Sequence, residues 1–219
     1  MRSLLVWLVV AAVAGPAAAQ GLPEGGGLDK FMKDSAAQQR ELQGIVERKK
    51  VGKAAPKKAK APKPPKHAPV GATDFKPSAG HPTVEMFLSS SNIDANQQQM
   101  LRSTFDGYFM ALGQMFRPNS VASGAGFALG VSIEIANETD LPEADARELV
   151  TGVNDMLAAS AEFKKLSSAE RQALYEVFVM TGALLQMMRT AGDTNPALKT
   201  QAQDMARQVI SQVSGLAAR

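Results

Sequence analysis

The chain of 219 residues contains no cysteine and only two histidines. The absence of cysteine excludes disulfide bonds, thiolate metal ligands and a lipid attached at a signal-peptide cysteine. Both histidines, His67 and His81, lie in or just after a segment rich in Lys, Ala and Pro, where we expect nothing to hold them rigidly. We therefore expect no metal site, no cofactor and no triad of the Ser-His-Asp type.

Long apolar runs are missing as well. The apolar stretch over residues 4–13 is shorter than the roughly 20 residues that a membrane-spanning helix needs. It follows Arg2 and precedes three consecutive alanines, an arrangement typical of a secretory signal peptide. The pattern predicts a signal peptide over residues 1–19 with cleavage before Gln20. We therefore expect an exported protein, periplasmic or secreted, that is not transmembrane after cleavage.

Charge is distributed unevenly along the chain. Residues 47–70 carry nine Lys or Arg and one Glu, which leaves a net charge of +8. Residues 71–219 carry 11 basic and 16 acidic side chains, which leaves −5. The basic pI therefore describes one short segment and does not identify the rest as a nucleic-acid-binding domain. We expect no specific nucleic-acid partner.

The composition of that basic segment is dominated by Lys, Ala and Pro, which leaves nothing to bury and predicts a disordered linker over residues 51–80. One interpretation is a solubilising spacer. The other is that its cations bind anionic envelope polymers or lipid headgroups through charge alone. The candidate polyanion-binding residues are Lys49, Lys50, Lys53, Lys57, Lys58, Lys60, Lys63 and Lys66.

Residues 20–50 combine a glycine-rich start with an amphipathic pattern. Apolar residues recur at spacings of three and four, which predicts one helix over residues 28–50. An isolated amphipathic helix is marginal in water, so this helix is expected to dock on the domain, to pair with another chain or to stay partly frayed. The apolar residues are Leu28, Phe31, Met32, Leu42, Ile45 and Val46.

From residue 81 the apolar residues recur with a helical period throughout, which predicts an all-α bundle of five helices over residues 81–219. One of these helices is expected to place Phe178 in the core. Each helix start has a capping residue or an N-terminal proline. These start signals are Asp94, Asn119 or Ser120, Pro142, Ser167 with Glu170, and Asn195 with Pro196.

The predicted helix over residues 121–137 is nearly uncharged and contains Gly124, Gly126 and Gly130, so we expect it to be central and closely packed. Glu134 interrupts its apolar pattern. If this side chain faces the interior, it is a candidate general acid of a muramidase-like glycan hydrolase. The alternative is that Glu134 and Glu138 share a solvated edge, and no second carboxylate can be placed across a cleft.

The methionines allow two interpretations. Four of them lie on predicted core stripes, whereas Met110, Met180 and Met187 fall off those stripes and are the better candidates for an adaptable binding groove. The four expected in the core are Met115, Met156, Met188 and Met205.

The export pattern and the low-complexity linker are followed by the Gly/Ala-rich helix, then by Ala161-Glu162-Phe163, Ser168-Ala169-Glu170-Arg171-Gln172 and Leu184-Leu185. This order resembles a family of uncharacterised exported bacterial helical proteins, a domain of unknown function. The resemblance covers about residues 83–214. It implies a helical fold and a bacterial envelope setting, and it supplies no activity and no site residues.

We interpret the chain as an exported, envelope-associated binding or interaction module without evident catalysis. The linker is expected to contact anionic polymers or lipids, and the helical domain to contact a protein partner. One alternative is a cell-wall glycan hydrolase that uses Glu134. The other is a passive structural head on a spacer.

Overall fold

The computed structural model describes residues 67–91 and 93–218, with side chains up to residue 211. The predicted signal peptide over residues 1–19, the predicted helix over residues 28–50 and residues 51–66 of the predicted linker lie outside this part of the chain. Within it the predicted all-α class is confirmed, and no helix there is long and apolar enough to cross a membrane. The helices are α4 (Pro82–Ser90), α5 (Ala95–Met115), α6 (Val121–Asn137), α7 (Glu143–Ala159), α8 (Ala161–Lys164), α9 (Ser168–Gly192) and α10 (Pro196–Ala218).

The five predicted helices correspond to α5, α6, α7, α9 and α10, whereas the short helices α4 and α8 were not predicted. Local capping signals explain the agreement for α5 and α9, whereas Ser120, an expected cap of α6, makes no side-chain capping bond and its hydroxyl contacts Thr73 instead. Asp94 accepts a hydrogen bond from the backbone N–H of Gln97, whose side chain accepts one from the N–H of Asp94, and Ser167 and Glu170 form the same reciprocal pair. Helices α4 and α8 are too short to show a clear apolar period.

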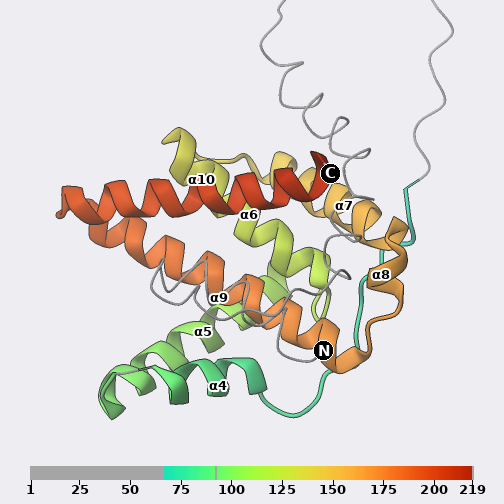
Figure 1. Cartoon of the computed structure of the whole chain (residues 1–219), viewed down its shortest axis with the longest axis horizontal. Coiled ribbons are helices and arrows are strands. Elements are labelled where there is room, and N and C mark those ends of the chain that lie inside the picture. Colours follow the sequence, from blue (N-terminus) through green and yellow to red (C-terminus); the bar gives the residue numbers. More distant parts are fainter. Residues whose placement is uncertain (1–66, 92, 219) are drawn as a thin grey trace, which may run out of the picture.

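Helix α6 lies at the centre, between α7, α9 and α10 (Figure 1). Twelve of its 17 residues are buried, which confirms the expectation of a central helix. Glycine permits this packing: a Cβ atom on Gly124 would lie 2.8 Å from the Tyr175 ring and 3.1 Å from the Tyr175 carbonyl oxygen on α9. The close approach of α6 and α9 therefore depends on the missing side chain.

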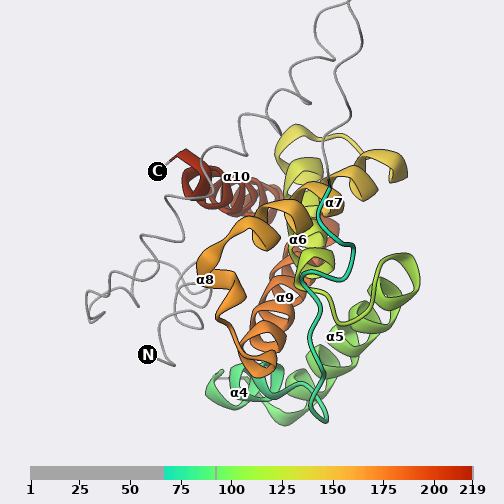
Figure 2. The same cartoon turned by 90° about the vertical axis from the view of Figure 1, so that its right-hand side faces the viewer.

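Helices α4 and α5 pack against each other and against α9, at the end of the molecule away from α10 (Figures 1 and 2). Phe105 is fully buried there, and the ring of Phe109 lies 5.6 Å from that of Tyr175 between ring centres. Phe178, expected in the core, is only partly buried and packs at the edge of this cluster. Its side chain lies at the border of the buried face of α9 and not at the centre of that face.

Residues 67–80 form an ordered segment, here called the strap, which runs over the helices toward α4 (Figure 2). Thr73 and Phe75 of the strap are buried. The prediction of a disordered linker over residues 51–80 is therefore wrong for residues 67–80, and the packed unit begins before residue 81. The low average hydrophobicity of the segment indicated disorder. In the structure, however, the Phe75 side chain is buried in the core and the Thr73 hydroxyl makes buried hydrogen bonds.

Candidate functional site

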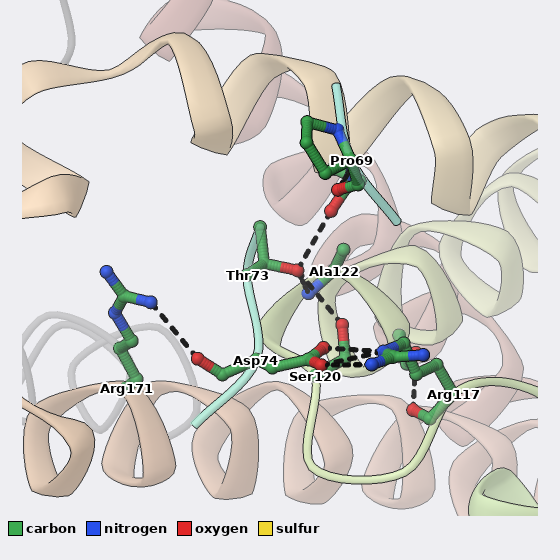
Figure 3. A network of polar contacts seen from close by, with 9 residues as sticks. Pro69, Thr73, Asp74, Arg117, Ser120, Ala122 and Arg171 are labelled. Carbon is green, nitrogen blue, oxygen red and sulfur yellow. Dashed lines mark hydrogen bonds and ion pairs between the residues drawn. The ribbon is translucent and has the colours of Figure 1, made fainter. Parts of the chain in front are cut away.

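The strap is held by a buried polar network around Thr73 (Figure 3). The Thr73 hydroxyl donates to Oδ1 of Asn154 on α7 at 3.2 Å and lies 2.9 Å from the hydroxyl of Ser120. Asn154 in turn donates to the carbonyl oxygen of Pro69 at 3.2 Å, and the N–H of Val121 donates to the carbonyl oxygen of Thr73. The network joins the strap to the start of α6 and to α7, and every group in it serves to fix the backbone.

Two arginines fix the strap from either side (Figure 3). Nε of Arg117 donates to both carboxylate oxygens of Asp74, at 2.8 and 2.7 Å, and this hydrogen bond raises the pKa of Arg117. Arg171 on α9 donates to the carbonyl oxygen of Asp74 at 3.0 Å and covers the ring of Phe163, with 4.6 Å between its guanidinium carbon and the ring centre. Asp74 thus contacts the connection between α5 and α6 through its carboxylate, and α9 through its carbonyl oxygen.

A second cluster surrounds Glu176, whose side chain on α9 is fully buried. Its Oε2 accepts a hydrogen bond from the backbone N–H of Thr83 at 2.8 Å, and its Oε1 accepts one from Nε2 of Gln172 at 2.8 Å. The first N–H groups of a helix have no partner within the helix, so α9 supplies the cap of α4. His81, the N-cap residue of α4, makes no capping bond through its own side chain.

His81 was expected just after the disordered linker, with nothing to hold it rigidly, and this expectation is wrong. Its ring stacks on Phe109, with 3.9 Å between ring centres and 10° between ring planes. Its Nδ1 atom is buried without a hydrogen bond and lies 3.5 Å from Oε1 of Glu176, while about one third of the side chain is exposed. The arrangement pairs a histidine with a buried carboxylate at the junction of the strap, α4 and α9.

Gln172 ties this cluster to the strap. Its Oε1 accepts hydrogen bonds from the N–H and the hydroxyl of Ser78, at 2.7 and 2.9 Å, and its Nε2 also donates to the carbonyl oxygen of Gly80.

Burial and the negative charge of Glu176 together raise the pKa of Tyr175 to about 12. In the described part of the chain no group of three His, Asp or Glu side chains is placed to hold a metal ion.

Glu134, the candidate general acid, lies on α6 with its carboxylate engaged on both oxygens. Oε1 accepts a hydrogen bond from the backbone N–H of Leu141 at 3.0 Å, and Oε2 accepts one from Arg189 on α9 at 3.0 Å. Arg189 also donates to Asp140 at 3.0 Å, a hydrogen bond that raises the pKa of Arg189. The carboxylate therefore links the connection between α6 and α7 to α9.

Glu138 does not share the surroundings of Glu134. It ends α6 in the left-handed conformation, with φ of 54°, and its carboxylate contacts Lys199 and Gln203 on α10. Hydrogen bonds from these two side chains lower the pKa of Glu138. The two carboxylates of α6 thus join α6 to different helices.

The other candidate residues separate into three groups. The eight lysines proposed to bind polyanions, Lys49 to Lys66, lie outside the described residues. Of the groove candidates Met110 is exposed and Met187 is partly buried, whereas Met180 is buried in the core and is not available to a ligand. Met115, expected in the core, is 55 % exposed.

Sequence reasoning missed the Glu176 cluster, although a signal for it exists. Gln172 and Glu176 are four residues apart and lie on the same face of α9 as the apolar residues Val179 and Ala183. Polar side chains on an apolar stripe indicate buried hydrogen bonding. Their partners, however, lie about 90 positions earlier in the chain, so the sequence does not identify them.

Comparisons with known proteins give one result. No curated protein and no solved structure matches the chain. The model of a family described as a family of unknown function (DUF6683) matches residues 1–219, and the chain therefore belongs to this family of unknown function, as its resemblance to such a domain implied.

Proposed function

We propose that this protein is an exported, envelope-associated binding module without catalysis, in which a helical head is carried on a basic linker. The observation that carries the proposal is the fixed point at which the linker joins the head. Asp155 on α7 accepts a hydrogen bond from the N–H of Ala68 at 2.7 Å and lies 2.6 Å from Nδ1 of His67. A few residues later Thr73 is fully buried, so the linker continues directly into the core.

The charges of the two parts support different roles. The linker, with nine cations over residues 47–70, is attracted to anionic polymers and lipid headgroups, where each cation contributes about 1 kcal/mol at low salt. The head, at −5 over residues 71–219, is repelled by the same surface. The linker therefore makes the contact and keeps the head at a distance, with residues 51–66 reaching up to about 50 Å when extended at about 3.1 Å per residue.

The glycan-hydrolase alternative rests on Glu134. A general acid of this kind must hold a proton, reach the glycosidic oxygen and face a second carboxylate across the sugar. Both oxygens of Glu134 are occupied by Arg189 and by the backbone of Leu141. We therefore prefer the binding module to the glycan hydrolase. The passive structural head is the remaining alternative, and the experiment must distinguish it from the binding module.

The test is co-sedimentation of the mature chain with anionic vesicles and with envelope fractions, at low and at high salt. We expect binding at low salt that is lost when the eight linker lysines are replaced by Gln, and lost near 1 M salt, where the screening length falls to about 3 Å. The matched control replaces the exposed head residues Lys76, Lys164 and Lys165 by Gln and should bind as before. Failure to bind at low salt would favour the passive head.

Export is tested separately. N-terminal sequencing of protein recovered from the periplasm or the medium should begin near Gln20. A cytoplasmic protein that retains Met1 would contradict the proposal.

A further inference from the structure

Helix α5 has an unusual surface for a helix at the edge of a domain. Of its 21 residues only Phe105, Phe109 and Leu112 are buried, so most of the helix faces outward. Nevertheless, Arg102 and Asp106 are its only charged residues. A solvent-facing helix surface is ordinarily rich in charge, so this surface is suited to contact with another part of the protein.

The outward face of α5 carries a regular pattern. Met100, Ser103, Gly107, Met110 and Gln114 are all exposed and are spaced by three, four, three and four residues. We call these five residues the α5 seam. Met100 and Met110 are 66 % and 65 % exposed, and a Cβ atom on Gly107 would meet nothing within 4 Å. This spacing is the one with which a helix packs lengthwise against a second helix, and the small residues leave room for it.

We propose that residues 28–50 of the same chain form an amphipathic helix that packs on the α5 seam. Apolar residues recur in that segment at the same spacings of three and four, with Phe31 and Ile45 among them. Such a helix is unstable alone in water and needs an apolar partner surface. The seam offers Met100 and Met110 as its apolar side chains, and none of its five residues is charged.

The length of the intervening chain permits this contact. The described chain begins at His67, so residues 51–66 connect the two parts and reach up to about 50 Å. A domain of about 150 residues has a radius of gyration of about 15 Å and is therefore roughly 40 Å across. The tether is long enough to bring residues 28–50 to α5.

Tethering also favours this occupant over a second copy of the chain. The seam offers only two large apolar side chains, Met100 and Met110, which form a small contact for two molecules meeting in solution. A segment tethered to the same molecule by a short connection can reach an effective concentration in the millimolar range, so a modest contact suffices. The inference does not rest on the proposed polyanion binding, because the contact with the seam uses the apolar residues of the segment and not its lysines.

Oxidation of methionine by hydrogen peroxide, followed residue by residue with mass spectrometry in the mature chain, tests the proposal. Met86 on α4 is 48 % exposed and lies outside the seam, so it serves as the internal reference. We expect Met100 and Met110 to oxidise about tenfold more slowly than Met86, the ratio for a seam that is open about one tenth of the time. Buried Met156 and Met180 should remain slow in every variant and report that the head is folded.

The decisive variant is Phe31→Asp combined with Ile45→Asp, in which Met100 and Met110 should oxidise as fast as Met86. The matched control, Ala37→Asp with Gly44→Asp, makes the same change of charge on the opposite face of the predicted helix and should keep the protection. Oxidation of both seam methionines as fast as Met86 in the unchanged chain would overturn the proposal. Protection that survives Phe31→Asp with Ile45→Asp and grows with protein concentration would overturn it too, because a second copy would then cover the seam.

Discussion

The fully buried carboxylate of Glu176 on α9 accepts the backbone N–H of Thr83 at 2.8 Å and thereby caps α4, a helix 93 positions earlier in the chain. Gln172 donates to the same carboxylate, so removal of the Glu176 side chain would leave the buried N–H of Thr83 without a partner and the Gln172 amide with only the carbonyl oxygen of Gly80. One side chain of α9 thus adds a cap to α4, beside the packing of α4 on α5 and α9.

Replacement of Glu176 by Ala should lower the free energy of unfolding by about 2–4 kcal/mol, because the N–H of Thr83 would be buried unsatisfied and the Gln172 amide would lose one of its two acceptors. Urea denaturation followed by circular dichroism measures this change. The control is Glu85→Ala, since Glu85 is an exposed carboxylate on α4 that pairs with Arg102 at the surface. A loss no larger than that of the control would show that the buried contact does not stabilise α4.

Alkaline pH should destabilise the protein through Tyr175. Its pKa is about 12 in the folded chain and about 10 in an unfolded one, so the unfolded state releases this proton first. The stabilisation is complete below about pH 10 and is lost as the pH rises toward 12. The midpoint of urea denaturation should therefore fall more steeply from pH 9 to pH 11 in the unchanged chain than in Tyr175→Phe.

The same shift can be observed directly. The chain has only two tyrosines, Tyr108 and Tyr175, and burial raises the pKa of Tyr108 as well. In the variant Tyr108→Phe, tyrosinate absorbance then reports Tyr175 alone. An ionisation close to the ordinary pKa of about 10 in the folded protein would contradict the buried position of this hydroxyl.

Substitution of Gly124 by Ala should destabilise the fold by about 1–3 kcal/mol, because the added methyl group would overlap the Tyr175 ring and force α6 away from α9. Gly113→Ala is the matched control. Its added Cβ atom lies 3.7 Å from Pro118, an ordinary contact, and the change should stabilise α5 by about 0.4–1 kcal/mol. Thermal denaturation of both variants should shift in opposite directions; equal shifts would mean that α6 and α9 are not closely packed.

Thr73→Val should cost about 1–3 kcal/mol, although the two side chains have nearly the same shape. The hydroxyl contacts with Asn154 and Ser120 would be lost inside the protein, where water cannot replace them. Thr190→Val, at an exposed position on α9, is the control and should change stability by less than about 0.5 kcal/mol. If the two variants behave alike in urea denaturation, the strap is not an integral part of the fold.

Several features of the fold followed from the sequence because they depend on neighbours along the chain. The pairing of Asp94 with Gln97 and that of Ser167 with Glu170 are settled within one helical turn. The central position of α6 followed from its glycines and its lack of charge, since such a helix is stable only when others cover it. The membership of a family of unknown function was also recognisable from the order of the export pattern, the low-complexity segment and the helix patterns.

The positions of the polar residues were decided by the tertiary structure. Thr73 lies in a segment whose average composition indicates disorder, and it is buried only because Asn154 and Ser120, 81 and 47 positions later, provide its hydrogen bonds. His81 is ordered because Phe109 supplies a ring to stack on and Glu176 closes the start of α4. None of these partners is within reach along the sequence.

The same distinction explains the methionines and the acidic residues. The period of α5 placed Met115 on the apolar stripe, yet in the structure its side chain is 55 % exposed. Glu134 interrupts an apolar helix, yet its role depends on Arg189, which lies 55 positions away and approaches only when α9 packs on α6. Periodicity determines which residues share a helix face, whereas the burial of that face and the pairing of its charges depend on which helices pack against it.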